Sequence, residues 1–119
     1  MVRPLLIFIP IFLYSNPNIL WFQDYGGTGE ESHGHFILSC DDGGFLQVGE
    51  TYDYSNNSSK LLIVKTNENG VLDWSREIGI GDHNLGNSVL ELTDGFLVVG
   101  GLNQNSSLIK LDKESGSTI

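Results

Sequence analysis

The chain has few basic residues and almost no cysteine. Its 119 residues include six Lys and Arg against 15 Asp and Glu, one Cys and three Pro, and the formal net charge is −9. A phosphate backbone is bound by clustered Lys and Arg, and anionic lipid attracts the same side chains. We therefore expect no nucleic-acid partner and no docking on an acidic membrane surface. The excess of carboxylates is typical of a surface that keeps a protein soluble.

Cys40 is the single cysteine, which excludes a disulfide within the chain and a metal site built from several thiolates. It follows an apolar run, where a small buried thiol is more typical than a nucleophile. No Ser-His-Asp set can be given catalytic roles from the sequence alone. We therefore predict a protein without a cofactor and without a catalytic constellation of its own.

The longest hydrophobic run stands near the N-terminus, from Pro4 to Tyr14, and follows Arg3. It is shorter than the roughly 20 residues that a membrane-spanning helix needs. A basic residue before a short apolar run fits a secretory signal, although the residues up to Ser15 lack the small-x-small pattern that a signal peptidase prefers. We predict that residues 1–18 are a signal peptide or an N-terminal hydrophobic segment, and that the protein is secreted, periplasmic or at the cell surface. An uncleaved anchor, the only membrane contact we expect, and a mis-assigned start are the alternatives.

Glycine is abundant, and much of it belongs to a repeat. The stretch Asp42-Gly43-Gly44-Phe45-Leu46-Gln47-Val48-Gly49 returns as Asp94-Gly95-Phe96-Leu97-Val98-Val99-Gly100. Each copy reads as a tight turn that leads into a short apolar strand, because Asp tolerates the bend and Gly supplies a positive φ. The residues that we expect to build the turns and the core of the repeat are Trp21, Gly26, Asp42, Gly43, Gly44, Phe45, Gly49, Gly70, Trp74, Gly79, Asp94, Gly95, Phe96, Gly100 and Gly116.

Around this stretch, the first unit predicts strands at 19–27, 35–39, 45–51, 61–65 and 71–79. Loops are expected at 28–34 and 52–59, and an Asn-Gly hairpin turn at 66–70. The second unit repeats the pattern, with a loop at 81–86, strands at 88–90 and 96–99, and a shorter loop at 104–106. Its closing strand is missing at 117–119, so we expect a piece of a longer repeat protein or a chain that completes itself with another copy.

A period of about 50 residues with four short strands is typical of propeller blades. The predicted fold class is all-β: two antiparallel four-stranded propeller blades, the second lacking its closing strand. Repeat 1 covers 19–73 and repeat 2 covers 74–119. Trp21 and Trp74 hold equivalent positions, where we expect each to pack between sheets.

The ordered recurrence of W-x-x-x-[YI]-G, D-G-(G)-F-L-x-V-G and L-I-[VK]-K-x-[ND]-x-x-G over residues 19–119 resembles the repeat of secreted bacterial β-propeller proteins. These are similar to kelch-like and related multi-blade domains. The resemblance implies an exported or surface-associated propeller of several blades, usually without an assigned catalytic function.

Several side chains are candidate ligands. Two loops carry oxygen donors that calcium could use, Asp53 with Asn56 and Asn57, and Asp82 with His83 and Asn84. Their alternation is incomplete for a calcium loop, so we favour solvated loops. His33 and His35 form an H-x-H pair that a strand would place on one face, but no third zinc ligand is evident.

Two further patterns have simple structural interpretations. The stretch from Ser39 to Phe45 partly resembles the Asp-box of sialidase-type propellers, in which Asp and Gly build a turn, and we favour a plain turn. Lysines near the strand ends are expected to extend their stems along the protein and reach solvent, namely Lys60, Lys65 and Lys110.

We hypothesise a non-catalytic, exported β-propeller module whose loops bind a protein or a glycan, or which serves in structural display. The alternative is the N-terminal fragment of a propeller enzyme, of the glycan hydrolase or lyase type, with its active site in missing blades. The loop acids that could line such a site are Asp24, Glu30, Glu31 and Asp82. Self-association of the two blades into a ring is a further possibility.

Overall fold

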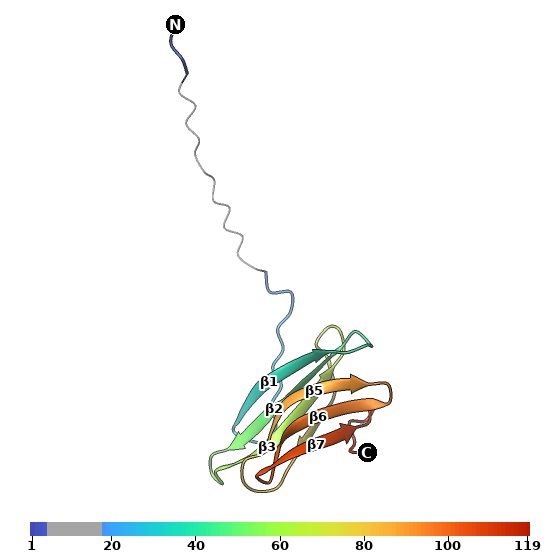
Figure 1. Ribbon diagram of the computed structural model, residues 1–119. Coiled ribbons are helices and arrows are strands. Elements are labelled where there is room, and N and C mark those ends of the chain that lie inside the picture. Colours follow the sequence, from blue (N-terminus) through green and yellow to red (C-terminus); the bar gives the residue numbers. More distant parts are fainter. Residues whose placement is uncertain (5–17) are drawn as a thin grey trace.

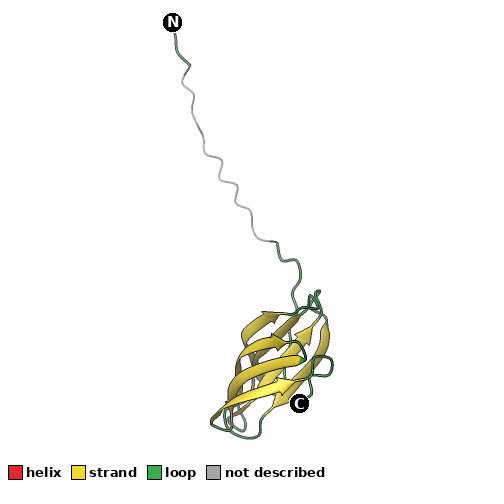
Figure 2. Ribbon diagram, turned by 45° about the vertical axis from the view of Figure 1, so that its right-hand side comes forward, coloured by secondary structure: helices red, strands yellow, loops and turns green. Residues whose placement is uncertain are grey.

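The computed structural model describes residues 1–4 and 18–119, and all regular structure within them is β (Figure 2). Sheet 1 has the strand order β1 (Glu31–Ser39), β2 (Phe45–Asp53), β3 (Ser58–Thr66) and β4 (Leu72–Ile78). Sheet 2 has the order β5 (Leu85–Leu92), β6 (Gly95–Leu102) and β7 (Asn105–Leu111). All pairs are antiparallel, and the sheets lie face to face (Figure 1). The prediction of an all-β, antiparallel fold is confirmed.

The N-terminal prediction falls mostly on residues 5–17, which lie outside the described residues. The described residues contain no helix that is long and apolar enough to cross a membrane.

Burial explains the two kinds of strand pattern. β2 alternates, with Leu46 and Val48 fully buried and Gln47 between them partly exposed. β3 is buried on both faces, since Leu61 to Val64 are at most 4% exposed. One face of β3 packs on sheet 2, and the other lies under residues 18–27. A central strand that is covered on both sides reads as a continuous apolar run.

Sequence reasoning misplaced several strand boundaries. Residues 18–27 form no strand, although 19–27 were predicted as one. The predicted loop 28–34 is strand from Glu31 onward, and the predicted loop 52–59 shrinks to the four residues between Asp53 and Ser58. β5 likewise starts within the predicted loop 81–86, and β7 within the predicted loop 104–106. Polar residues join these strands because the ladder is made by backbone groups, whatever the side chain.

The core lies between the sheets. Sheet 1 contributes chiefly Leu46, Val48, Leu61, Ile63 and Trp74, and sheet 2 contributes Val89, Phe96, Val98, Ile109 and Leu111. These side chains are at most 8% exposed. Burial of apolar surface at about 25 cal/mol per Å² supplies the main force that holds the two sheets together.

The two sheets share local irregularities as well as strands. The first strand of each has a bulge, between Gly34 and Phe36 in β1 and between Gly86 and Ser88 in β5. Opposite each bulge stands a glycine of the repeated motif. A Cβ on Gly49 would lie 1.8 Å from the His33 carbonyl oxygen, and one on Gly100 would lie 2.2 Å from that of Leu85. Only glycine allows the strands to approach so closely at these two points.

Each tryptophan packs on the glycine of a following turn. Trp74 projects from β4 onto Gly116 and lies 6.4 Å, centroid to centroid, from Phe96. Trp21 lies in the same relation to Gly70 and to Phe45, at 6.1 Å. Trp74 is 8% exposed whereas Trp21 is 47% exposed, because sheet 2 closes over Trp74 only.

The repeat in the sequence is offset from the sheets. Trp74, the first residue of the second predicted repeat, lies inside β4 of sheet 1. Sheet 2 has three strands and one further bridge, between Leu111 and Thr118. Ile119 N–H also donates to the Lys110 carbonyl at 2.9 Å. Within the described residues the second sheet therefore lacks a full fourth strand, as predicted.

Candidate functional site

The loops 54–57, 79–84 and 103–104, together with residues 28–30, gather at one end of both sheets, and we call them the rim. β2 ends and β3 begins there, and so do β4 and β5. Ser59, at the start of β3, donates hydrogen bonds to the loop that links the sheets, so the loops of sheet 1 and the linking loop lie at the same end of the molecule. Loops held on a rigid sheet scaffold commonly carry binding sites.

Asn84 fastens the rim. Its side chain is fully buried, its amide nitrogen donates to the carbonyls of Ser59 at 2.8 Å and Gly81 at 2.7 Å, and its side-chain oxygen accepts from Asn103 N–H at 2.8 Å. One amide thus joins β3 of sheet 1, the loop that links the sheets and the loop after β6 of sheet 2. Replacing Asn84 by an apolar residue should destabilise the fold, because the buried partners of its amide would be left without hydrogen bonds.

Three aromatic rings, two from sheet 1 and one from the loop that links the sheets, meet on the rim. Tyr52 lies 4.9 Å from Tyr54 in an edge-on arrangement at 66°. It also stacks on His83, at 6.1 Å and 16°. Tyr52 belongs to the end of β2, and His83 to the loop between the sheets. Tyr54 is 61% exposed, so the cluster presents an aromatic surface to solvent.

Polar groups surround and orient these rings. The Tyr54 hydroxyl donates to the Glu31 carboxylate, and the Tyr52 hydroxyl donates to the Asn57 side chain. Glu30 accepts from the Tyr54 backbone N–H at 3.1 Å and from the Ser55 hydroxyl at 3.3 Å. Because these acceptors hold the loop in place, the aromatic surface is organised before any partner arrives.

A small polar cavity adjoins the rim. It measures about 50 Å³ and is lined by Thr28, Gly29, Thr51, Asp53, Ser58 and Lys60. Glu77 closes this region by accepting from the Thr28 hydroxyl at 2.7 Å and from Lys60 Nζ at 3.0 Å. Burial opposes ionisation of Glu77, but these bonds outweigh it and lower the pKa of the carboxyl. The cavity holds at most a few water molecules.

In the two candidate calcium loops, the carboxylates of Asp53 and Asp82 accept hydrogen bonds from neighbouring side chains. Asp53 accepts from the Asn56 side chain at 2.6 Å, which is the main reason that its pKa is lowered. Asp82 accepts from Gln104 at 2.6 Å, and Asn84 points into the rim. Among the described residues, no three His, Cys, Asp or Glu side chains form a group that could hold a metal ion.

The two histidines of the H-x-H pair both face Glu50. His33 Nδ1 is 3.6 Å and His35 Nε2 is 3.9 Å from the same carboxylate oxygen. His33 also bonds Glu31 at 2.9 Å, and these two carboxylates raise the His33 pKa, Glu31 the more strongly. The other His35 nitrogen lies 3.0 Å from the Gly86 carbonyl, which links β1 to β5.

The remaining loop acids are spread out. Glu30 and Glu31 hold the Tyr54 loop, and Asp82 is bonded to Gln104. Asp24 is exposed on the segment before β1.

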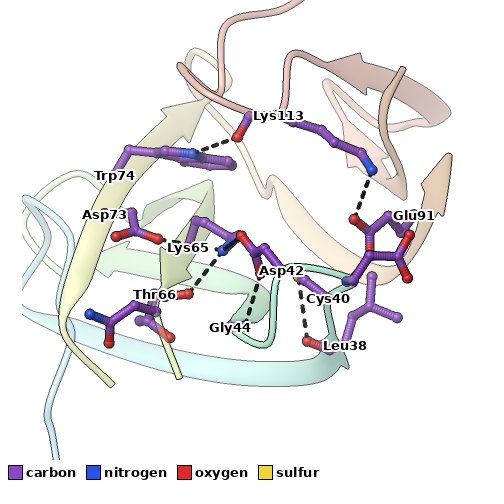
Figure 3. Close-up of polar contacts among 12 residues, drawn as sticks. Leu38, Cys40, Asp42, Gly44, Lys65, Thr66, Asp73, Trp74, Glu91 and Lys113 are labelled. Atoms are coloured by element: carbon purple, nitrogen blue, oxygen red, sulfur yellow. Dashed lines mark hydrogen bonds and ion pairs between the residues drawn. The ribbon is translucent and has the colours of Figure 1, made fainter. Parts of the chain in front are cut away.

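The opposite end of the sheets holds a charged cluster (Figure 3). Lys65 is 3% exposed, and its Nζ lies 2.7 Å from Asp42, 2.9 Å from the Thr66 carbonyl and 3.4 Å from Asp73. Burial opposes the Lys65 charge, yet Asp42 and Asp73 together raise the pKa. The expectation that Lys65 reaches solvent is therefore wrong, because sheet 2 covers its stem.

Cys40 lies beside this cluster and is 6% exposed. Burial raises the pKa of its thiol to about 11, so at neutral pH it is protonated and a poor nucleophile. The turn that follows is closed by Cys40 N–H to the Gly44 carbonyl at 2.9 Å and by Gly44 N–H to the Asp42 carboxylate at 2.8 Å. This is the local geometry of a plain tight turn.

The other repeated residues lie in turns and close contacts. A Cβ on Gly44 would lie 2.1 Å from the Thr66 carbonyl oxygen, and one on Gly95 would lie 2.5 Å from that of Leu111. Glycines with positive φ at these turns are Gly43, Gly70, Gly79 and Gly116. Asp94 pairs with Lys110 at 2.7 Å, which repeats the Asp42–Lys65 pair. Gly26 lies 3.9 Å, measured from its would-be Cβ, from Ser32.

Sequence reasoning missed the aromatic cluster and the Asn84 network. Tyr52 and Tyr54 stood in a stretch read as a loop of turn-forming residues, and His83 is far from them in sequence. The only available signal was two tyrosines in a loop otherwise made of Asp, Ser and Asn. Comparison of the chain with protein-family models, with curated proteins and with solved structures found no match.

Proposed function

We propose that the chain is a non-catalytic, exported module of two propeller-type repeats, and that its rim binds glycan. Two features support the repeat interpretation. Each sheet has the same bulge, the same close glycine contact and the same Asp–Lys pair. The backbones of the sheets also approach most closely where β5 lies on β1 and β2, and their contacts become sparser toward β3 and β6, as in wedge-shaped neighbours around an axis.

The glycan proposal rests on one observation, the exposed aromatic surface of Tyr54, Tyr52 and His83 with carboxylates and amides around it. A sugar ring has an apolar C–H face and an edge of hydroxyls. An aromatic ring covers the first, and acceptors such as the Glu31 carboxylate bind the second. Export is supported by Arg3 and the apolar run that follows it.

A glycan array, followed by titration calorimetry on the best ligand, tests this function. We expect Tyr54→Ala to weaken binding at least about tenfold, because an exposed aromatic anchor is lost. Tyr54→Phe retains the ring and should keep most of the affinity. Val71→Ala is the matched control, since Val71 is similarly exposed but lies at the opposite end of the sheets.

The proposal fails if the wild-type chain binds no glycan on the array, or if Tyr54→Ala and Val71→Ala bind alike. Release of free sugar during the same incubations would instead support the enzyme alternative.

A further inference from the structure

The two sheets do not pack through the same face of the repeated unit: one face of sheet 1 contacts the opposite face of sheet 2. The face of sheet 1 that meets sheet 2 is called the front, and it carries Leu38, Leu46, Val48 and Ile63. It packs on the opposite face of the repeat in sheet 2, the back, which carries Val89, Phe96, Val98 and Ile109. The chain therefore contains one front-to-back interface between two copies of the same unit.

The front face of sheet 2 has no cover within the described residues. Strand register places its apolar side chains on one face, opposite one another, and they are Leu90, Leu97, Val99 and Leu108. In the repeat these are the counterparts of the buried front residues of sheet 1. Ile63 is fully buried, yet its counterpart Leu108 is 70% exposed, and Leu90 is 61% exposed. Exposed apolar side chains gathered on one sheet face mark an interaction surface.

The back face of sheet 1 is covered only in part, by residues 19–25, and it is open at β1. Its residues Ile37, Phe45, Gln47 and Val64 are the counterparts of the buried back residues of sheet 2. Ile37 is 61% exposed, whereas its counterpart Val89 is 2% exposed. A hollow of about 160 Å³ lies on this face, lined by the residues just named together with Trp21, Gln23, Tyr25 and Thr66.

The segment at 19–25 occupies the place of a neighbouring sheet's last strand. Trp21 lies on Gly70 and Phe45 as Trp74 lies on Gly116 and Phe96. Trp74 belongs to β4, which pairs with β3 and places Trp74 opposite Lys65. The counterpart of Lys65 is Lys110 on β7. The end of β7 at Lys110 and Leu111 contacts residues 118–119, but from Asn105 to Ile109 the described residues leave that edge of β7 unpaired. The segment thus has the contacts of a fourth strand whose own sheet is elsewhere.

We propose that a second copy of this chain docks head to tail. The front of sheet 2 of one copy packs on the back of sheet 1 of the next, and residues 19–25 of the next copy add to the free edge of β7. The chain itself argues for this occupant, because the same two faces already form its internal interface. Such an interface is heterologous, so it builds a closed ring or an open filament rather than a face-to-face pair. This inference is independent of glycan binding.

Light scattering coupled to size exclusion tests the assembly with the full chain at about 100 μM, where even weak association is populated. We expect the wild type to be an oligomer, with a mass of at least twice the 13.1 kDa of one chain. Leu108→Glu on the front face and Ile37→Glu on the back face should each give monomers. Both positions are largely exposed, so neither change opens a cavity, and circular dichroism checks the fold. Leu90→Lys is a second front-face variant should Leu108→Glu fail to fold.

Ile80→Glu is the matched control, because Ile80 is 89% exposed and lies on neither face. It should leave the assembly intact. Non-specific aggregation through other apolar segments would persist in Leu108→Glu, Ile37→Glu and Ile80→Glu alike.

Mixing the two monomeric variants decides the geometry. Leu108→Glu retains an intact back, and Ile37→Glu retains an intact front. Their mixture should therefore form one good interface and stop at a dimer, whose mass is twice 13.1 kDa. A symmetric pair that used the same face of both copies would instead leave one of the two variants dimeric by itself. The inference is overturned if the wild type is a monomer, if Ile80→Glu dissociates the assembly as well as Leu108→Glu does, or if the mixture stays monomeric.

Discussion

Removing the acidic partners of Lys65 should destabilise the fold more than removing Lys65 itself. Lys65 is 3% exposed, whereas the side chains of Asp42 and Asp73 are 58% and 44% exposed. If Lys65 is replaced by Met, both carboxylates can hydrate where they are, and the Met stem fills the same space. If the carboxylates are neutralised, the buried ammonium keeps the neutral Thr66 carbonyl as a partner but loses both opposite charges. An uncompensated buried charge is the costly case.

The magnitudes follow from this asymmetry. Breaking a buried ion pair costs about 3–5 kcal/mol, and the half-exposed carboxylates here place the double change Asp42→Asn/Asp73→Asn near the lower limit. Asp42→Asn alone should cost about 1–2 kcal/mol, because Asp73 remains 3.4 Å from Nζ. Lys65→Met should lie within about 1 kcal/mol of the wild type.

Urea unfolding followed by tryptophan fluorescence measures these differences through the midpoint and the slope. Trp74 is the reporter, since it lies between the sheets and is 8% exposed. Several protein concentrations are needed, because association stabilises the folded state.

The chain supplies its own control in the repeated pair Lys110–Asp94. Its distance is the same 2.7 Å, but its side chains are 36% and 70% exposed. Asp94→Asn should leave the midpoint unchanged, since exposed pairs contribute little. The reasoning is refuted if Lys65→Met costs more than the double change, or if Asp94→Asn costs as much as Asp42→Asn.

Three further predictions concern packing, pH and reactivity. Gly49→Ala should cost at least about 2 kcal/mol in urea unfolding, because its Cβ would meet a strand carbonyl oxygen at 1.8 Å, whereas Gly101→Ala, with open space around it, should be neutral. The stability that the Asp42 and Glu91 carboxylates contribute should be fully present above their ordinary pKa values of 3.8 and 4.5, and should be lost as the pH falls through their lowered pKa values in the folded protein. Thermal melts between pH 6 and pH 2 measure this loss, and a melting temperature that did not change with pH would contradict the prediction. Cys40 should react with a thiol reagent only as fast as the protein unfolds, since the thiol is buried and its pKa is raised to about 11; rapid labelling of the folded chain would contradict this.

The sequence alone determined the class of fold. Turn residues at regular spacing and short apolar runs favour antiparallel strands over any helical arrangement, and the Asp-Gly-Phe-Leu recurrence marks two units of one kind. The strand boundaries could not be predicted from the sequence, because polar residues such as Ser32 and His33 in β1 pair through backbone groups, and composition does not report that pairing.

The tertiary structure alone decided what each repeated residue does. Ile63 and Leu108 hold the same place in their units, as do Lys65 and Lys110. The first of each pair is buried, whereas Leu108 is 70% exposed and the Lys110 side chain is 36% exposed. The rim is decided in the same way, since His83 becomes a neighbour of Tyr52 only when the two sheets stack. Local sequence sets the shape of a unit, but burial depends on what covers it. Among the described residues, sheet 2 covers the front face of sheet 1, and no sheet covers the front face of sheet 2.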